Sequence, residues 1–290
     1  MRAPVKLNRA FWPRLLNRVL PSAADPRPLA AHALSGTAFS EAVSTFKFGR
    51  TFKTTEKARF PEAIAILSSL EYRAPPVVLD VGASDGVTSL DVMKAMPFER
   101  YIVSDAHMTV FSSTDGGRTY YYAADGRCIL VATDAWIVYA DADDACAPLG
   151  SVARGFHSRA PQLEPTAREI TLINPALERA LSAAVSTRQY DILQEWPHGK
   201  VDLVIAANIL NRAYFSEEEL RKAVRNLARA LQGEGRLAII ENRDRERATI
   251  FRVRGHDATV EHRLNGGSEI EELVRNHALS SIISAANQAT

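Results

Sequence analysis

The sequence predicts an α/β fold with a doubly wound, mostly parallel sheet, a helical N-terminal arm and a β-rich insertion after the second strand. Three observations predict it: apolar runs alternate with helical patterns over 61–290, one run enters a glycine-containing turn, and strand-like runs break the alternation over 106–168. At 290 residues the chain can hold one large domain with an extension. We therefore expect a basic arm or lid at 1–60 and a main domain at 61–290 carrying the inserted β-subdomain.

The run Val77–Val81 leads into the pattern Asp80-x-Gly82-x-x-x-Gly86. Continuous apolar runs are typical of buried parallel strands, and glycines allow a sharp turn and close approach of a ligand to the backbone. The residues after Gly86 can begin a helix, whose N-terminal N–H groups and dipole attract negative charge. The motif therefore predicts a pocket for a nucleotide-like molecule that carries a carboxylate or a phosphate.

The rest of the main domain follows the same alternation of strand and helix. Ser216 and Glu219 have the spacing of a capping box, which marks the start of a helix. In chain order we expect a helix at 61–72, strands at 77–81, 101–105, 186–192 and 201–207, a helix at 216–231, a helix stop and turn at 232–235, a strand at 236–241, a hairpin of 248–253 with 259–264, and a helix at 268–277.

Two further segments complete the organisation. Within the insertion, 119–122, 128–131 and 136–139 read as strands, and Asp125-Gly126 is a strong hairpin signal between the first two. Near the N-terminus, apolar residues and arginines recur at near-helical spacing, and Pro13 indicates that the helix begins there. The proline-rich stretch 21–28 is typical of a linker.

Composition and charge exclude several function classes. The chain is 46% hydrophobic and 24% charged, with a net charge of +1, which gives no general argument for nucleic acid. Residues 1–60 hold eleven Lys or Arg and three Asp or Glu, a net +8, which leaves −7 for the rest. Cys128 and Cys146 are too few for a disulfide framework, and arginines interrupt every apolar stretch near the N-terminus, so we expect a reducing, cytoplasmic location.

The spacing of Asp80, Gly82, Gly86 and Asp105 resembles the class I S-adenosylmethionine-dependent methyltransferases, which are Rossmann-like. The strand at 201–207, the following helix, the two glycines at 233 and 235 and the next strand match the same family. The resemblance covers about residues 60–242. It implies S-adenosylmethionine as cofactor and methyl transfer to an oxygen or nitrogen of a small polar or amphiphilic acceptor.

The resemblance also implies roles for residues of the first two strands. Gly82, Ser84 and Gly86 would let the backbone approach the methionine part of the cofactor, and Asp80 would balance its ammonium. Asp105 would accept hydrogen bonds from the ribose hydroxyls, as an acid at this position does in other ribose-binding doubly wound folds. Ser84 departs from the family, which often has a glycine at that position.

Later strand ends supply the remaining candidates. Asp191 and Ile192 match the position that meets the adenine, and Asn208 ends the strand beside which the methyl group would lie. Asn208 and Asn211 could orient a polar substrate, and Tyr214 could stack on it or relay a proton. The 208–215 loop also resembles a stretch of the chemotaxis-receptor methyltransferases, with two extra residues before Tyr214, which leaves a protein substrate as a lesser alternative.

Other interpretations of the chain stay open. A nicotinamide site would need glycines at 82, 84 and 87, where Ser84 and Val87 stand. A non-catalytic protein with the same fold, serving as a partner or membrane-associated subunit, is an alternative, since no general base is evident. Magnesium chemistry would have to use Asp134, Asp141, Asp143 and Asp144, a cluster more typical of a solvated loop; no metal is expected.

The basic segments allow several partners. Aromatic and basic residues alternate over 46–53, which suits a lid, a nucleic-acid contact or a packed edge strand. The N-terminal helix could pack on the domain, rest on an anionic membrane surface or belong to a transit peptide. The β-rich insertion could cover the substrate or form a homodimer contact.

Overall fold

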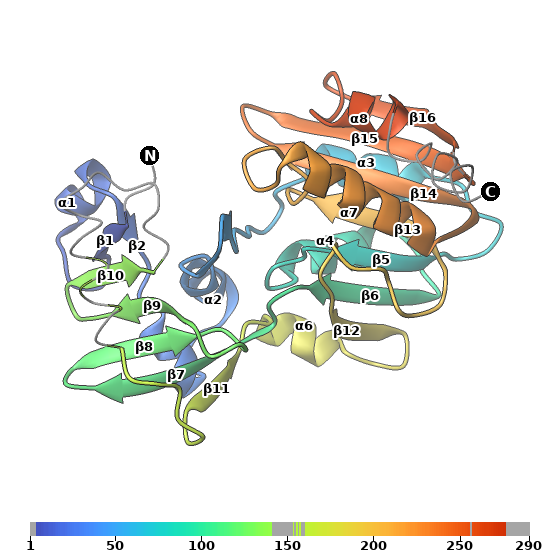
Figure 1. Cartoon of the computed structure of the whole chain (residues 1–290). Coiled ribbons are helices and arrows are strands. Elements are labelled where there is room, and N and C mark those ends of the chain that lie inside the picture. The colour runs from blue at the N-terminus through green and yellow to red at the C-terminus, as the bar shows by residue number, and fades with distance from the viewer. Residues whose placement is uncertain are drawn as a thin grey trace, which may run out of the picture. The chain divides into compact units, whose positions relative to one another are not determined.

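A computed structural model describes residues 4–140, 153, 155, 157, 160–255 and 257–276. The chain divides into two compact units (Figure 1). The first unit comprises residues 1–55 and 107–176, and the second comprises 56–106 and 177–290.

The second unit contains a seven-stranded sheet in the order β12-β6-β5-β13-β14-β15-β16. Neighbouring strands from β12 to β14 are parallel, and β15 and β16 are added as antiparallel strands. The predicted doubly wound, mostly parallel sheet is therefore confirmed. The strands are β5 (Val77–Val81), β6 (Arg100–Asp105), β12 (Val185–Gln189), β13 (Val201–Ala207), β14 (Leu231–Asn242), β15 (Glu246–Arg254) and β16 (Asp257–Leu264).

The strand order reverses between β5 and β13. From β5 the chain proceeds to β6 and β12 on one side, and then returns to β13 on the other side of β5. In open α/β sheets, ligands bind in the crevice at the carboxyl ends of the strands where the order reverses. The residues after β5 and β13 therefore lie at the place where a ligand is expected.

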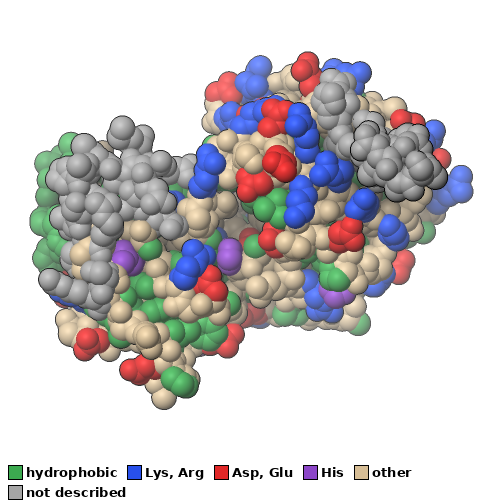
Figure 2. All heavy atoms as spheres, viewed as in Figure 1, with side chains coloured by type: hydrophobic (Ala, Val, Ile, Leu, Met, Phe, Trp, Pro, Cys, Tyr) green, Lys and Arg blue, Asp and Glu red, His purple; other side chains and the backbone are tan. Residues whose placement is uncertain are grey.

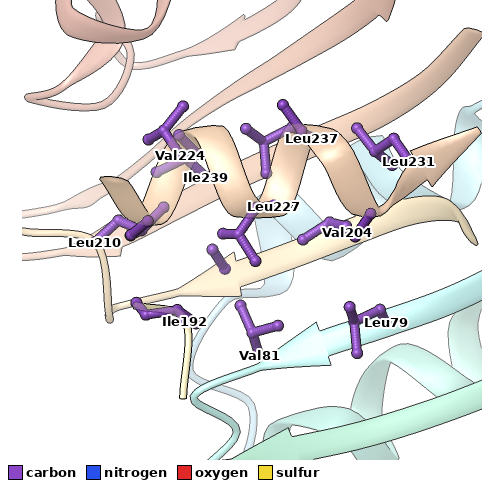
Figure 3. Packing of buried hydrophobic residues seen from close by; sticks show 14 of the residues in the cluster. Leu79, Val81, Ile192, Val204, Leu210, Val224, Leu227, Leu231, Leu237 and Ile239 are labelled. Carbon is purple, nitrogen blue, oxygen red and sulfur yellow. The ribbon is translucent and has the colours of Figure 1, made fainter. Parts of the chain in front are cut away.

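Helices cover the sheet of the second unit. They are α3 (Pro61–Ser69), α4 (Val87–Ala95), the end of α6 (Pro175–Ala180), α7 (Glu217–Ala230) and α8 (Glu271–Asn276). The capping box of α7 is confirmed, because the Ser216 side chain accepts from the Glu219 N–H and the Glu219 carboxylate accepts from the Ser216 N–H. Leu227 and Val224 of α7 point toward the sheet (Figure 3), where they join the main core.

Several strand limits differ from the sequence-based expectation. The third parallel strand ends at Gln189 instead of 192, and the expected turn at 232–235 lies within β14. A register shift between Val201 and Leu203 accommodates this extra length against β13. Gly233 and Gly235 therefore belong to a bulged strand. This strand begins at Leu231, directly after the last residue of α7, Ala230.

The first unit is built on a second seven-stranded sheet, in the order β11-β7-β8-β9-β10-β1-β2. The three strands expected in the insertion are confirmed, and β8 and β9 form the expected hairpin, with Gly126 at φ +83°. The strands are β1 (Val5–Asn8), β2 (Ser22–Ala23), β7 (Thr109–Asp115), β8 (Arg118–Tyr122), β9 (Cys128–Ala132), β10 (Trp136–Tyr139) and β11 (Arg168–Thr171).

The N-terminal segment does not form the separate helical arm that the sequence predicted. β1 pairs with β10, and β2, which lies in the expected linker, pairs with β1. Residues 4–55 therefore share one unit with the insertion. β1 depends on a partner more than a hundred residues away, which local periodicity does not reveal.

The remaining N-terminal elements are α1 (Arg14–Val19), the 3₁₀ helix η1 (Arg27–Ala31), α2 (Gly36–Val43), β3 (Lys47–Phe48) and β4 (Thr51–Phe52). All of them except α1 contribute residues to one core with this sheet. Phe46 is fully buried and Phe48 is 9% exposed, and both belong to the core with Tyr121 of β8. Among the interpretations of 46–53, the structure favours the packed one, because its aromatic side chains face the core of their own unit.

Candidate functional site

The glycine loop between β5 and α4 uses left-handed backbone at three positions. Gly82, Ser84 and Gly86 have φ values of +64°, +59° and +84°. A Cβ on Gly82 would lie 2.8 Å from Ile209, and one on Gly86 would lie 2.2 Å from Leu177. Both glycines are thus required by the packing of the chain itself, and Ile209, from the loop after β13, lies directly over Gly82.

Asp105 connects the end of β6 to this loop. Its Oδ2 accepts the backbone N–H of Ser84 at 2.9 Å, and the Ala83 N–H donates to the Ser104 carbonyl at 3.0 Å. Asp105 is 9% exposed and is thus largely buried beside the loop. The structure therefore brings together Gly82, Ser84, Gly86 and Asp105, the first cluster that the sequence predicted.

Asp80 is placed differently from an open ligand-binding side chain. It is 2% exposed, and its Oδ2 accepts hydrogen bonds from the Ser89 hydroxyl at 2.7 Å and the Tyr101 hydroxyl at 2.9 Å. Burial raises the pKa of Asp80 to about 6, and the two hydroxyls lower it in part. Within the fold, Asp80 joins α4 and β6 to β5.

Asn208 joins the carboxyl ends of β13 and β14. Its φ is +60°, a left-handed conformation that asparagine tolerates better than most residues. Its N–H donates to the Ile240 carbonyl at 2.7 Å, and its Oδ1 accepts the Asn242 N–H at 3.0 Å. No described residue accepts a hydrogen bond from its Nδ2, so the amide presents a donor at the point where the strand order reverses.

Asn211 and Tyr214 shape the loop that follows. The Asn211 Oδ1 accepts the Ala213 N–H at 3.0 Å, and its Nδ2 donates to the Asn208 carbonyl at 3.3 Å. The Tyr214 N–H donates to the Asn211 carbonyl at 3.1 Å, and the tyrosine is half-buried. Both polar ends of Asn211 are therefore occupied in a turn, whereas Tyr214 lies at the loop's edge.

Asp191 and Ile192 lie just beyond β12, and their side chains differ in exposure. Asp191 is exposed, and its Oδ1 accepts the Leu193 N–H at 2.9 Å. Ile192 is 5% exposed, packs in the core beside Leu210 (Figure 3), and its carbonyl accepts from Asn226 Nδ2 at 3.0 Å. Only Asp191 presents its side chain outward at this position.

Arg59 is a residue at this edge that the sequence analysis missed. Its carbonyl accepts from the Asn242 Nδ2 at 3.4 Å, which places it beside the end of β14. Burial lowers the pKa of the Arg59 guanidinium, and Glu56 and Tyr214 interact with its charge. A basic residue two positions before the helix that leads into β5 was the available signal.

Two buried glutamates also hold this region together. The Glu246 carboxylate accepts the N–H groups of Glu62, at 3.1 Å, and Ala63, which caps the start of α3. Glu241 is 3% exposed, its Oε1 accepts the Glu269 N–H at 3.0 Å, and burial raises its pKa. These acids satisfy backbone donors rather than facing a ligand.

The structure offers little support for a metal centre. Among the described residues, no group of three His, Cys, Asp or Glu side chains could hold a metal ion. Asp134 pairs with Arg27 at 2.6 Å, while Asp141, Asp143 and Asp144 lie outside the described residues.

Over the described part of the chain, no helix is both long and apolar enough to cross a membrane.

Comparisons with known proteins found similarity only among solved structures. No family model matches the sequence, and no curated protein does. The similar structures include the mitomycin 7-O-methyltransferase MmcR (14% identity, TM-score 0.33, 63% of this chain and 35% of that chain). They also include CalO1, a methyltransferase in calicheamicin biosynthesis in its SAH-bound form (17%, 0.33, 62% and 34%), and a cyclase, SpnF (16%, 0.32, 62% and 43%).

This chain therefore spans less than half the length of those three proteins. At such identities and TM-scores, the similarities assign neither an activity nor a ligand to it. The order and direction of the strands carry the assignment of the fold. The unit formed by 56–106 and 177–276 is a Rossmann-like, doubly wound α/β domain, the fold expected from its resemblance to class I S-adenosylmethionine-dependent methyltransferases.

Proposed function

We propose that the second unit binds S-adenosylmethionine and that the chain transfers its methyl group to an oxygen or nitrogen of a small polar or amphiphilic acceptor. The observation that carries the proposal is the bond between Asp105 Oδ2 and the Ser84 N–H. It joins the acid that ends the second strand to the glycine loop, beside the point where the strand order reverses. An acid at that place suits the two hydroxyls of a ribose.

The residues at this edge fit the cofactor's other groups. The N-terminus of α4 and the loop 82–86 suit a carboxylate, and Arg59 adds a cation near the ends of β13 and β14. Asp80 would act on the cofactor's ammonium through its charge, since its Oδ2 already accepts two hydroxyls. A nicotinamide dinucleotide fits less well, because Ser84 and Val87 replace two of the glycines it would need.

When bound, the cofactor supplies a sulfonium whose methyl group is already activated for transfer. The chain then has to align an acceptor and exclude water. The Asn208 Nδ2 is a donor that could orient a polar acceptor, and the half-buried Tyr214 offers an aromatic face. Ile209 over Gly82 adds an apolar side chain beside the loop. A base is required only if the acceptor must lose a proton.

Titration calorimetry with S-adenosylmethionine and S-adenosylhomocysteine tests the proposal. Asp105→Ala should abolish binding of both ligands, and Asp105→Asn should weaken it at least roughly tenfold, since it loses charge while keeping an acceptor for the Ser84 N–H. Asp115→Ala, at an exposed residue of β7, is the control and should bind normally. Wild-type protein that binds neither ligand, or Asp105→Asn with full affinity, would refute the assignment.

A non-catalytic protein with this fold is the second candidate. The observation that favours it is the use of both polar ends of Asn211 within its own loop, which leaves that residue no group for a substrate. Transfer of a radiolabelled methyl group to any member of a broad acceptor panel decides for the enzyme. Cofactor binding without transfer across that panel decides for the alternative.

A further inference from the structure

Exposed apolar side chains gather at one place in the first unit. Large hydrophobic residues exposed by 36–73% surround α1, and Figure 2 shows hydrophobic side chains at the left edge, where Figure 1 places α1. We call this group, together with the half-buried Trp12, the α1 patch; it consists of Phe11, Trp12, Leu15, Leu16, Val19, Leu20 and Trp136. Over the described residues, the one other exposed large hydrophobic side chain is Leu181. Such clustering is characteristic of an interaction surface.

The α1 patch is held in place by the sheet beneath it. The Trp12 indole N–H donates to the Ala135 carbonyl at 2.8 Å, and its ring lies 5.6 Å from that of Trp136. Phe11 packs edge-on against Trp12 at 5.2 Å. Asn17 of α1 donates to the Trp12 carbonyl at 2.9 Å. The patch is therefore preformed. However, α1 itself buries no residue in its own unit, which argues against the interpretation of α1 as a helix packed on the domain.

The charged residues of α1 itself, Arg14 and Arg18, are both basic. Up to Asp25 the sequence contains five basic residues and no acidic one. Arg9 pairs with Glu41 at 3.3 Å. Arg14 and Arg18 of α1 make no ion pair with any described residue, and both are exposed. An occupant of the patch must therefore accept apolar side chains and supply negative charge.

We propose that the α1 patch docks the chain on an anionic lipid surface. A second copy of the chain packed helix to helix would bring Arg14 and Arg18 toward like charges, and the acids beside the patch, Glu41 and Asp134, already pair with Arg9 and Arg27. A bilayer interface offers phosphate and carboxylate groups to the arginines and acyl chains to Leu15 and Val19. Indole rings such as that of Trp136 suit the same interface, because they are apolar with one polar edge. The six-residue α1 would lie on the surface rather than span it.

Vesicle sedimentation with the full chain tests this docking. Two kinds of vesicle are compared, pure phosphatidylcholine and anionic vesicles in which roughly a third of the lipid is phosphatidylserine. Wild-type protein should bind the anionic vesicles more strongly, and this binding should weaken as salt rises. Leu15→Asp combined with Val19→Asp should lower the partition coefficient at least about tenfold. Arg14→Gln combined with Arg18→Gln should lower it roughly fivefold per arginine, on the anionic vesicles only.

A matched control and a depth measurement complete the design. Leu181→Asp removes the exposed hydrophobic side chain of the other unit and should leave binding unchanged. Brominated lipids should quench Trp12 and Trp136 but not the buried Trp196. The inference is overturned if wild-type protein binds neither vesicle, if Leu181→Asp reduces binding as much as the α1 variants, or if the α1 variants instead dissociate a dimer in sedimentation velocity. None of these readouts depends on methyl transfer.

Discussion

Replacing Asp80 by Asn should change how the stability of the second unit depends on pH. Burial raises the pKa of Asp80 from its ordinary value of 3.8 to about 6. Its contribution to stability is therefore fully present below about pH 3.8 and is lost as the pH rises through 6, because the folded state must then hold a buried charge. A difference of about two pKa units corresponds to about 3 kcal/mol. Asp80→Asn, which cannot ionise, escapes that loss.

The assay is urea unfolding of both proteins between pH 4 and pH 7, followed by the fluorescence of Trp196. Trp12 and Trp136 are first replaced by Phe, so that the signal comes from the second unit alone. The free energy of unfolding of Asp80→Asn should rise relative to its parent by about 2.4 kcal/mol across this range, since part of the titration of the unfolded carboxyl lies below pH 4. Comparing variant with parent cancels the titration of all other carboxylates.

A second variant fixes the direction of the effect. The Ser89 hydroxyl lowers the pKa of Asp80, so Ser89→Ala should raise that pKa further and extend the pH range over which stability is lost. A difference between Asp80→Asn and its parent that does not vary with pH would refute the reasoning. A difference that shrinks as the pH rises would refute it too, since Asp80 would then be stabilised as a carboxylate in the fold.

Three other substitutions test the loop and its surroundings. Gly86→Ala should destabilise the second unit by roughly 2 to 4 kcal/mol in urea unfolding, because Ala at φ +84° is strained and its Cβ would displace Leu177; an unchanged midpoint would contradict this. Ser216→Ala should cost about 1 kcal/mol in the same assay, since it removes the cap of α7. Asn208→Asp keeps the acceptor for the Asn242 N–H, so stability should hold while methyl transfer to the acceptor falls roughly tenfold; an unchanged transfer rate would remove the Nδ2 from the site.

The parallel sheet was predictable because its strands carry their own signal. Val77–Val81 is buried at every position, and Val201–Ala207 is nearly so, which is why each reads as a continuous apolar run. The start of α7 was equally clear, since a capping box is local in sequence. By contrast, β12 has only one buried residue and its limits were misjudged.

The first unit was not predictable in the same way. β1 is four residues long, and it is a strand only because β10 lies beside it, with Leu7 opposite Trp136. No periodicity within 5–8 reveals a partner that far along the chain. Pro13 did mark the beginning of α1 correctly, but whether that helix is buried depends on what surrounds it.

For the candidate site, positions were easier to predict than roles. Sequence spacing placed Asp105, Ser84 and Asn208 at the same edge of the sheet, and the structure agrees. It could not show that the polar atoms of Asn211 are occupied by a turn. It also did not show that Arg59 lies beside Asn242, because that proximity arises only when α3 packs on the sheet.

The polar residues at this edge first solve a structural problem. Where parallel strands end, the chain must leave through left-handed turns, and Ser84 and Asn208 adopt such conformations without being glycine. Side-chain oxygens at the strand ends hold those turns. Asp105 accepts the Ser84 N–H of the loop, and Asn208 accepts the Asn242 N–H at the end of β14. The Asn208 amide uses its oxygen for this bond, and no described residue accepts from its Nδ2, so Asn208 can hold a turn and meet a ligand at once. This makes Asn208 a stronger candidate than Asn211, whose oxygen and nitrogen both serve the loop.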